Sequence, residues 1–207
     1  HTADSRGHAN HGWLNAYHSF SFASWYNPDR VQFGMLRVLN DDTIAAGMGF
    51  GTHPHDNMEI ITIPLEGDLA HKDSMGNAAT IKTGDVQVMS AGTGIQHSEF
   101  NPNADQQTKL FQIWLFPKYR NVAPRYQRIT LEVTEQKNNF AQILSPNPDD
   151  AGVWIHQDAW FYLSDFDADF SKKLALQKEG NGFYIMTIEG EIEVNGERLS
   201  KRDALGI

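Results

Sequence analysis

Two short stretches of the chain each carry a pair of titratable side chains two residues apart. GTHPHDNMEI contains His53 and His55, and SAGTGIQHSEF contains His97 and Glu99. In a β-strand, residues i and i+2 point to the same face, so each pair faces one side of a sheet. Four such groups in one small interior would be costly to desolvate without a cation. If the two strands are neighbours, the sequence predicts a site for one first-row divalent metal formed by His53, His55, His97 and Glu99.

A second carboxylate shares the parity of the first histidine pair. Glu59 lies four residues after His55, so it faces the same interior if the strand continues without a break. Parity alone therefore allows either Glu59 or Glu99 to supply the carboxylate ligand.

Composition excludes several function classes. The 207 residues hold 17 Lys and Arg against 26 Asp and Glu, a net charge of -9, which disfavours direct nucleic-acid binding and anionic membrane surfaces. The chain has no cysteine, so thiolate metal sites, disulfides and cysteine nucleophiles are excluded. No apolar run is long enough to span a bilayer, and we expect a cytoplasmic location. The polar start without Met and the apolar end, DALGI, suggest that both natural termini are incomplete.

Strand patterns dominate the sequence. Short runs rich in Val, Ile, Phe and Trp are separated by Gly, Asn, Asp and Pro, and several alternate with period two. The clearest runs are FGMLRVLN (33–40), NMEIITIPLEG (57–67), DVQVMS (85–90), KLFQIWLFP (109–117) and FYIMTIEGEIEVNG (183–196). Long amphipathic helices are absent from the pattern, although a short helix is considered at 20–27 or 165–176. An all-β chain of sandwiches or barrels follows.

The chain also contains an internal repeat. LEGDLA (65–70) followed by IKTGDVQV (81–88) resembles IEGEIEV (188–194) followed by LSKRDALGI (199–207). Both units read as strand, Gly turn, strand, and a turn ending in Asp before a further strand. The polar segment NNFAQILSPNPDDAG predicts a boundary between a metal-binding barrel at 1–137 and a second, truncated barrel at 138–207. The second unit has only His156, so we expect no metal there.

The remaining histidines have mainly structural interpretations. His8 and His11 could form another metal pair, but no third ligand lies nearby in sequence, which favours a polar turn. His18 is interpreted as a packing or hydrogen-bonding residue. His71 and Asp73 precede an MGN turn and are interpreted as hairpin residues that could touch a ligand. Five apolar side chains could either line the metal cavity or fill plain core: Met48, Phe50, Met89, Phe111 and Trp114.

Several motifs together resemble a known family. The spacing of Gly47, His53-Pro54-His55, Glu59 and Gly67 resembles the first cupin motif, and that of Gly84, Gly92 and His97 resembles the second. Five further stretches are similar to the pirin family, especially its bacterial quercetinase-like members: RGHANHGW, HSFSFA, GFGTHPH, HKDSMGN and SAGTGIQHSE.

This resemblance implies a bicupin, with two jelly-roll-like antiparallel β-barrels of which only the first binds metal. The implied ligands are His53, His55, His97 and Glu99. General cupins would use the carboxylate of Glu59 instead, which we assign to orienting an imidazole. The implied metal is one divalent transition ion, with iron expected first and Mn, Co, Ni, Cu or Zn as alternatives.

The resemblance also implies an activity similar to quercetin 2,3-dioxygenase. A small flavonol or other aromatic enol would react with O2, with Glu99 as the catalytic base that takes the hydroxyl proton. The alternative is a non-enzymatic, metal-dependent redox sensor that acts on a protein partner. A third hypothesis makes quercetin a surrogate for another enol or catechol-like substrate. The family also suggests a monomer.

Overall fold

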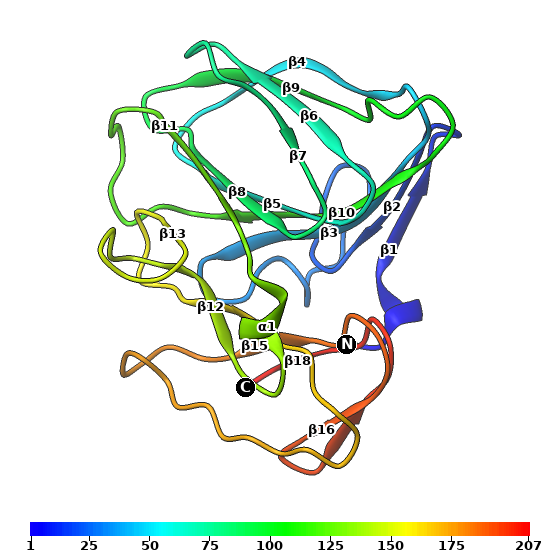
Figure 1. The fold of residues 1–207 in the computed structure, drawn as a ribbon, viewed down its shortest axis with the longest axis vertical. Helices are drawn as coiled ribbons and strands as arrows, with labels where there is room; N and C mark the ends of the chain where they lie inside the picture. The colour runs from blue at the N-terminus through cyan, green and yellow to red at the C-terminus, as the bar shows by residue number, and fades with distance from the viewer.

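The computed structural model describes residues 1–207, apart from the side chain of Val133. Two antiparallel sheets form the first part of the chain. The larger sheet, in spatial order, contains β1 (Gly7–Asn10), β2 (Leu14–His18), β3 (Leu36–Ile44), β10 (Thr108–Leu115), β5 (Glu59–Glu66), β8 (Asp85–Ser90) and β11 (Arg125–Thr130). The smaller sheet contains β4 (Gly49–His55), β9 (Ile95–Phe100), β6 (Leu69–Asp73) and β7 (Ala78–Ile81). The two sheets face each other across an interior, as Figure 1 shows.

The larger sheet is covered on both faces, so its central strands are buried throughout. In β5, Ile61 and Ile63 pack in the largest apolar cluster, together with Ile143 and Leu144 from the second half of the chain. Thr62 points the other way, into the interior between the sheets, where it contacts polar residues. Alternation along a strand therefore divides its side chains between an interdomain core and a candidate site.

The second part of the chain is made of short strands below the larger sheet (Figure 1). They are β12 (Ala141–Ser145), β13 (Val153–Trp154), β14 (Phe161–Leu163), β15 (Tyr184–Met186), β16 (Ile192–Val194), β17 (Glu197–Leu199) and β18 (Ala204–Gly206). β12 pairs with β13 and β14, β15 with β18, and β16 with β17. These sheets are cupin-like and do not close into continuous barrels.

The predicted repeat is visible in the pairing. β5 pairs with β8 as β15 pairs with β18, and β6–β7 corresponds to β16–β17. The turns agree in detail, because Asp85 accepts a hydrogen bond from the Lys82 N–H and Asp203 accepts one from the Ser200 N–H, both at 2.9 Å. An all-β chain with two cupin-type units is therefore confirmed.

The expectation of a short helix at 20–27 or 165–176 is wrong. Residues 20–27 form turns around a Phe22–Trp25 bridge, and no helix occurs at 165–176 among the described residues. The aromatic side chain of Phe20 is instead drawn into the interdomain core. The helical segments described are η1 (Ala3–Ser5) and α1 (Val133–Gln136). Neither is long and apolar enough to cross a membrane.

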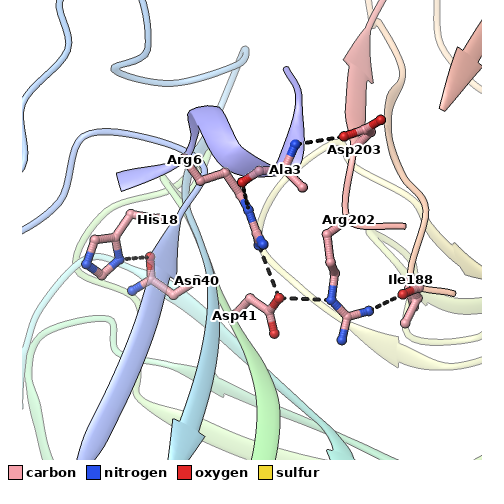
Figure 2. Close-up of polar contacts among 8 residues, drawn as sticks. All are labelled: Ala3, Arg6, His18, Asn40, Asp41, Ile188, Arg202 and Asp203. Carbon is pink, nitrogen blue, oxygen red and sulfur yellow. Dashed lines mark hydrogen bonds and ion pairs between the residues drawn. The ribbon is translucent and has the colours of Figure 1, made fainter. Parts of the chain in front are cut away.

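The first residues of the chain lie against its last strand. The amino group of His1 donates to the Ala204 carbonyl at 2.8 Å, and the Ala204 N–H donates back to the His1 carbonyl at 2.8 Å. Figure 2 shows the neighbouring contacts, in which one oxygen of Asp41 on β3 accepts from Arg6 at 3.1 Å and from Arg202 at 2.9 Å. The predicted domain limits, 1–137 and 138–207, stay a prediction, and residues before β1 contact both halves.

Candidate metal centre

The first histidine pair is brought against the second by pairing of β4 with β9. His53 lies directly opposite His97 in this antiparallel ladder, and the register shifts between Phe50 and His53. The close approach needs a glycine at position 49, because a Cβ there would lie 2.2 Å from the Glu99 carbonyl oxygen. The expected neighbouring strands are therefore present.

Three imidazoles meet at this crossing. The ring centroids of His53 and His97 are 4.4 Å apart, and that of His55 lies 4.9 Å from each of the other two. Each ring offers a nitrogen, and these three nitrogens all lie within 4.8 Å of one another. His97 is buried, while His53 and His55 are half-buried, so one side of the cluster faces solvent.

The imidazoles are arranged as electron-pair donors. Burial, followed by the charges of His53 and His55, lowers the pKa of His97 to about 3, and burial also lowers the pKa of His55 to about 4. Both rings are therefore neutral near pH 7. Neither nitrogen of His97 has a hydrogen-bond partner among the described residues. The Nδ1 of His53 lies 2.8 Å from the Gly51 carbonyl, which fixes it as the N–H donor and leaves Nε2 free.

The carboxylate of Glu99 lies behind the imidazoles. Its side chain is buried, and its oxygens accept hydrogen bonds from Gln112 at 2.8 Å and Thr62 at 3.3 Å. Burial raises the pKa of Glu99 despite these hydrogen bonds and the nearby imidazoles. One of its oxygens lies within 4.8 Å of a ring nitrogen of His97 and of one of His71, but Glu99 is not part of the set formed by His53, His55 and His97. Its assignment as a ligand and base stays a prediction.

Glu59 does not have the predicted role. The chain turns between β4 and β5, where Asn57 adopts a left-handed φ of 46°, so the parity from His55 does not carry through. The Glu59 side chain lies on the opposite face of the larger sheet, where its carboxylate accepts a hydrogen bond from Ser90 Oγ at 2.6 Å. Burial raises its pKa, opposed by hydrogen bonds from Ser90 and the His156 backbone. It therefore orients no imidazole.

Two residues beside the predicted ligands were not singled out by the sequence: His71, which was interpreted mainly as a hairpin residue, and Gln112, which was not identified. His71 is buried, its ring centroid lies 5.4 Å from that of His97, and its Nε2 lies 3.2 Å from Asp73. The i, i+2 spacing of His71 and Asp73 was a signal equal to that of the other pairs. Gln112, which holds Glu99, carries no such signal, because an isolated glutamine on a strand is not distinctive.

The other candidates have mostly structural positions. His8 lies 2.6 Å from the Asn15 side chain and stacks on Tyr17, and the exposed His11 joins no donor group among the residues described. His18 hydrogen-bonds Asn40, as its structural interpretation predicted.

The five apolar candidates have different surroundings. Trp114 packs against His55 at 4.9 Å between centroids, and Phe50 lies 6.4 Å from His53. Met89 packs beside Trp114 in a small buried cluster, whereas Met48 is exposed. Phe111 belongs to the interdomain core on the other face of the larger sheet, so a cavity-lining role for it is wrong.

Family comparisons agree with this geometry. Residues 1–115 match the model of the pirin family, and residues 142–207 match a quercetinase C-terminal cupin domain. The chain belongs to the pirin family. Quercetin 2,3-dioxygenase from Escherichia coli K12 is 43% identical to this pirin over 209 residues, which cover 99% of the chain and 87% of the relative. A pirin-like protein from Caulobacter vibrioides is also 43% identical, over 205 residues that cover 99% of the chain and 88% of the relative.

A solved structure with a bound metal is similar throughout. The bacterial pirin YhhW from Escherichia coli, in complex with nickel(II), has a TM-score of 0.83 and 40% identity, covering 100% of this chain and 87% of that one. The donors of this pirin fit such an ion, because imidazole suits first-row divalent metals and the buried nitrogens of His97 lack other partners. The site thus supports binding of a divalent metal of unassigned identity.

Proposed function

We propose that this pirin is a metal-dependent dioxygenase that opens the ring of flavonols such as quercetin. The observation that carries the proposal is the half-open cluster of His53, His55 and His97 above the buried carboxylate of Glu99. A metal site used for catalysis keeps a position open to substrate, whereas a structural site is closed by protein ligands. The similarity to the Escherichia coli relative named quercetin 2,3-dioxygenase supports the same activity class.

The histidines and the glutamate have separate tasks in this proposal. His53, His55 and His97 would hold the ion with the nitrogens that hydrogen bonds leave free. A divalent ion there would act as a Lewis acid that lowers the pKa of an enol hydroxyl. Glu99 would ligate the ion and take the hydroxyl proton, since burial raises the affinity of its carboxylate for protons. Gln112 would hold the carboxylate in place through its 2.8 Å hydrogen bond.

The substrate would approach from the half-exposed side. Phe50, which packs edge-to-face on Trp13, borders His53, and the indole of Trp114 lies against His55. Apolar rings beside a polar centre suit a planar aromatic enol.

The overall reaction balances without a further reductant or oxidant. The flavonol and one O2 would give a depside and one carbon monoxide, with both atoms of O2 retained in the depside. The proton taken by Glu99 would return to the product when the ring has opened. An iron ion, a cytoplasmic location and a monomeric state belong to this proposal as predictions.

Quercetin consumption by apo-protein reloaded with single metals tests the proposal. Iron, manganese, cobalt, nickel, copper and zinc are supplied separately in air, and carbon monoxide is measured beside the loss of flavonol absorbance. We expect metal-dependent turnover that His97→Ala abolishes and that His11→Ala, an exposed imidazole, leaves unchanged. Stoichiometric metal binding without turnover by any metal would refute the dioxygenase and favour a metal-dependent regulator of a protein partner. Turnover of other enols at higher kcat/KM than quercetin would identify quercetin as a surrogate.

A further inference from the structure

A groove lies between the interdomain face of the larger sheet and the second part of the chain. Its volume is about 460 Å³, which is within the usual range of small-molecule sites. Its walls come from β2, β3, β5 and β10 on one side and from the segments around Ile188 and Arg202 on the other. Arg202 lies over the ring of Phe111, which belongs to the interdomain core, so the groove is separate from the metal centre.

The groove has a surplus of positive charge, although the chain as a whole carries a net charge of -9. Four basic and three acidic side chains line it. Two of the basic groups are neutralised within the groove by lysine–glutamate pairs, Lys109–Glu66 at 2.5 Å and Lys201–Glu189 at 2.8 Å. The surplus therefore lies on the two remaining basic side chains, which are arginines.

These arginines, Arg6 and Arg202, share a single carboxylate oxygen. The Oδ2 of Asp41 accepts from both guanidinium groups, and the two arginine side chains are only 6% and 13% exposed (Figure 2). The carbonyls of Ala3 and Ile188 accept one further hydrogen bond each but carry no charge. The Nη2 group of each arginine makes no hydrogen bond with a described residue and is not fully buried. Its N–H donors are therefore open to an anion in the groove.

The backbone holds Arg202 in a conformation that favours glycine. Its φ is 67°, in the left-handed region. The same position in the first copy of the repeat is Gly84, with a φ of 94°, since both turns are closed by matching hydrogen bonds to Asp85 and Asp203. An arginine at a strained position that suits glycine indicates that its side chain has a task of its own.

Both guanidinium groups are fixed before any ligand arrives. That of Arg6 lies 4.8 Å from the centroid of Tyr17, and that of Arg202 lies 5.2 Å from the centroid of Phe111. Stacking on a ring and bonding to Asp41 restrict each side chain, which lowers the entropy cost of binding a ligand.

We propose that this groove binds a small organic carboxylate. Its oxygens would accept from the free guanidinium donors of Arg6 and Arg202, which match the planar geometry of a carboxylate. Its carbon skeleton would pack on the apolar side chains of Leu65 and Ile188, which also line the groove. The inference does not depend on the dioxygenase proposal, because the groove and the metal centre share no residue.

Calorimetric titration of the nickel-loaded protein with benzoate, acetate and phosphate, at constant ionic strength, would test the inference. We expect one benzoate per chain, bound more tightly than acetate, because acetate has no ring to cover the apolar wall. Arg202→Gln should weaken benzoate binding by about 10–100-fold, the effect of losing one charge-assisted hydrogen bond. Arg120→Gln, at an exposed arginine outside the groove, is the matched control and should bind as the parent does.

Two further variants keep the test decisive. Arg202→Gly also removes the guanidinium and suits the left-handed backbone, so it answers the question if Arg202→Gln does not fold. Asp41→Asn removes the carboxylate that competes for the same arginines, so it should bind benzoate more tightly than the parent. A purely structural role of the three charged residues predicts no benzoate binding in any variant.

Three results would overturn the inference. The first is the absence of saturable benzoate binding by the parent chain. The second is phosphate binding at least as tight as benzoate, which would exclude the carboxylate class. The third is benzoate binding that persists in both Arg202 variants and is lost in His97→Ala, which would place the anion on the nickel ion. Titration of the metal-free chain should give the parent affinity, so a failure of the metal site would be distinguished from a failure of the groove.

Discussion

Replacing Asp42 by asparagine should make the apo-protein more stable as the pH rises, relative to the parent chain. Asp42 lies on β3 with its side chain in the interior between the sheets, 4% exposed, and its Oδ1 has no hydrogen-bond partner among the described residues. Burial, followed by the charges of Glu99 and Asp41, raises its pKa from 3.8 to about 8. The folded chain therefore keeps Asp42 neutral at a pH where the unfolded chain ionises it.

The sign and size of the effect follow from proton linkage. Below pH 3.8 the carboxyl is protonated in both states and has no pH-dependent effect on stability. Between 3.8 and about 8 the unfolded state gains by ionising, so the parent chain loses about 1.4 kcal/mol of unfolding free energy per pH unit from this group. At pH 7 the accumulated loss is about 4 kcal/mol, as an order of magnitude. Asparagine cannot ionise and does not suffer this loss.

Urea unfolding of the metal-free parent and Asp42→Asn at intervals between about pH 4.5 and 7.5 measures the difference. The difference in unfolding free energy should rise with pH in favour of the variant. An unpaired amide would add a constant offset of about 1–3 kcal/mol, so the slope is the quantity to compare. Asp29→Asn, at an exposed carboxyl, is the control for the loss of a charge. A difference that stays flat over this range, or falls, would refute the assignment of a buried neutral acid.

Two other substitutions test how the site and the interdomain contact are held. Gln112→Leu removes the 2.8 Å hydrogen bond to Glu99 and should weaken nickel binding by about 10–100-fold in a chelator competition. Gln32→Leu, at an unrelated position, is the control. If Gln112→Leu binds nickel with the affinity of the parent chain, Gln112 does not hold the carboxylate. Asp41→Ala leaves the largely buried Arg6 and Arg202 without their shared acceptor. It should lower the free energy of unfolding, measured in urea, by about 3–5 kcal/mol. An unchanged urea midpoint of unfolding would show that this contact adds nothing to stability.

Local periodicity predicted the parts of this site that lie within single strands. His53 with His55, and His97 with Glu99, follow the i, i+2 rule, and the cross-strand contact of His53 with His97 required only that β4 and β9 be neighbours. The repeat was also readable, since its turn residues recur at matching positions.

Features that depend on chain reversal or on long-range pairing could not be read in the same way. Parity failed for Glu59 because left-handed Asn57 turns the chain into the other sheet. Gln112 reaches Glu99 only because β10 lies beside β5 in the opposite sheet, a register that no local pattern specifies. Phe20 was expected near a short helix, but packing in the interdomain core determines its conformation.

Calorimetric titration of the apo-protein with nickel is the most direct test that the three imidazoles form a metal site. We expect one ion per chain in the parent and in His11→Ala. His97→Ala should lose that binding, because it removes the imidazole whose two buried nitrogens have no other partner among the described residues. Circular dichroism of each variant before titration confirms that the sheets are retained. One ion bound by His97→Ala with the affinity of the parent would contradict the site.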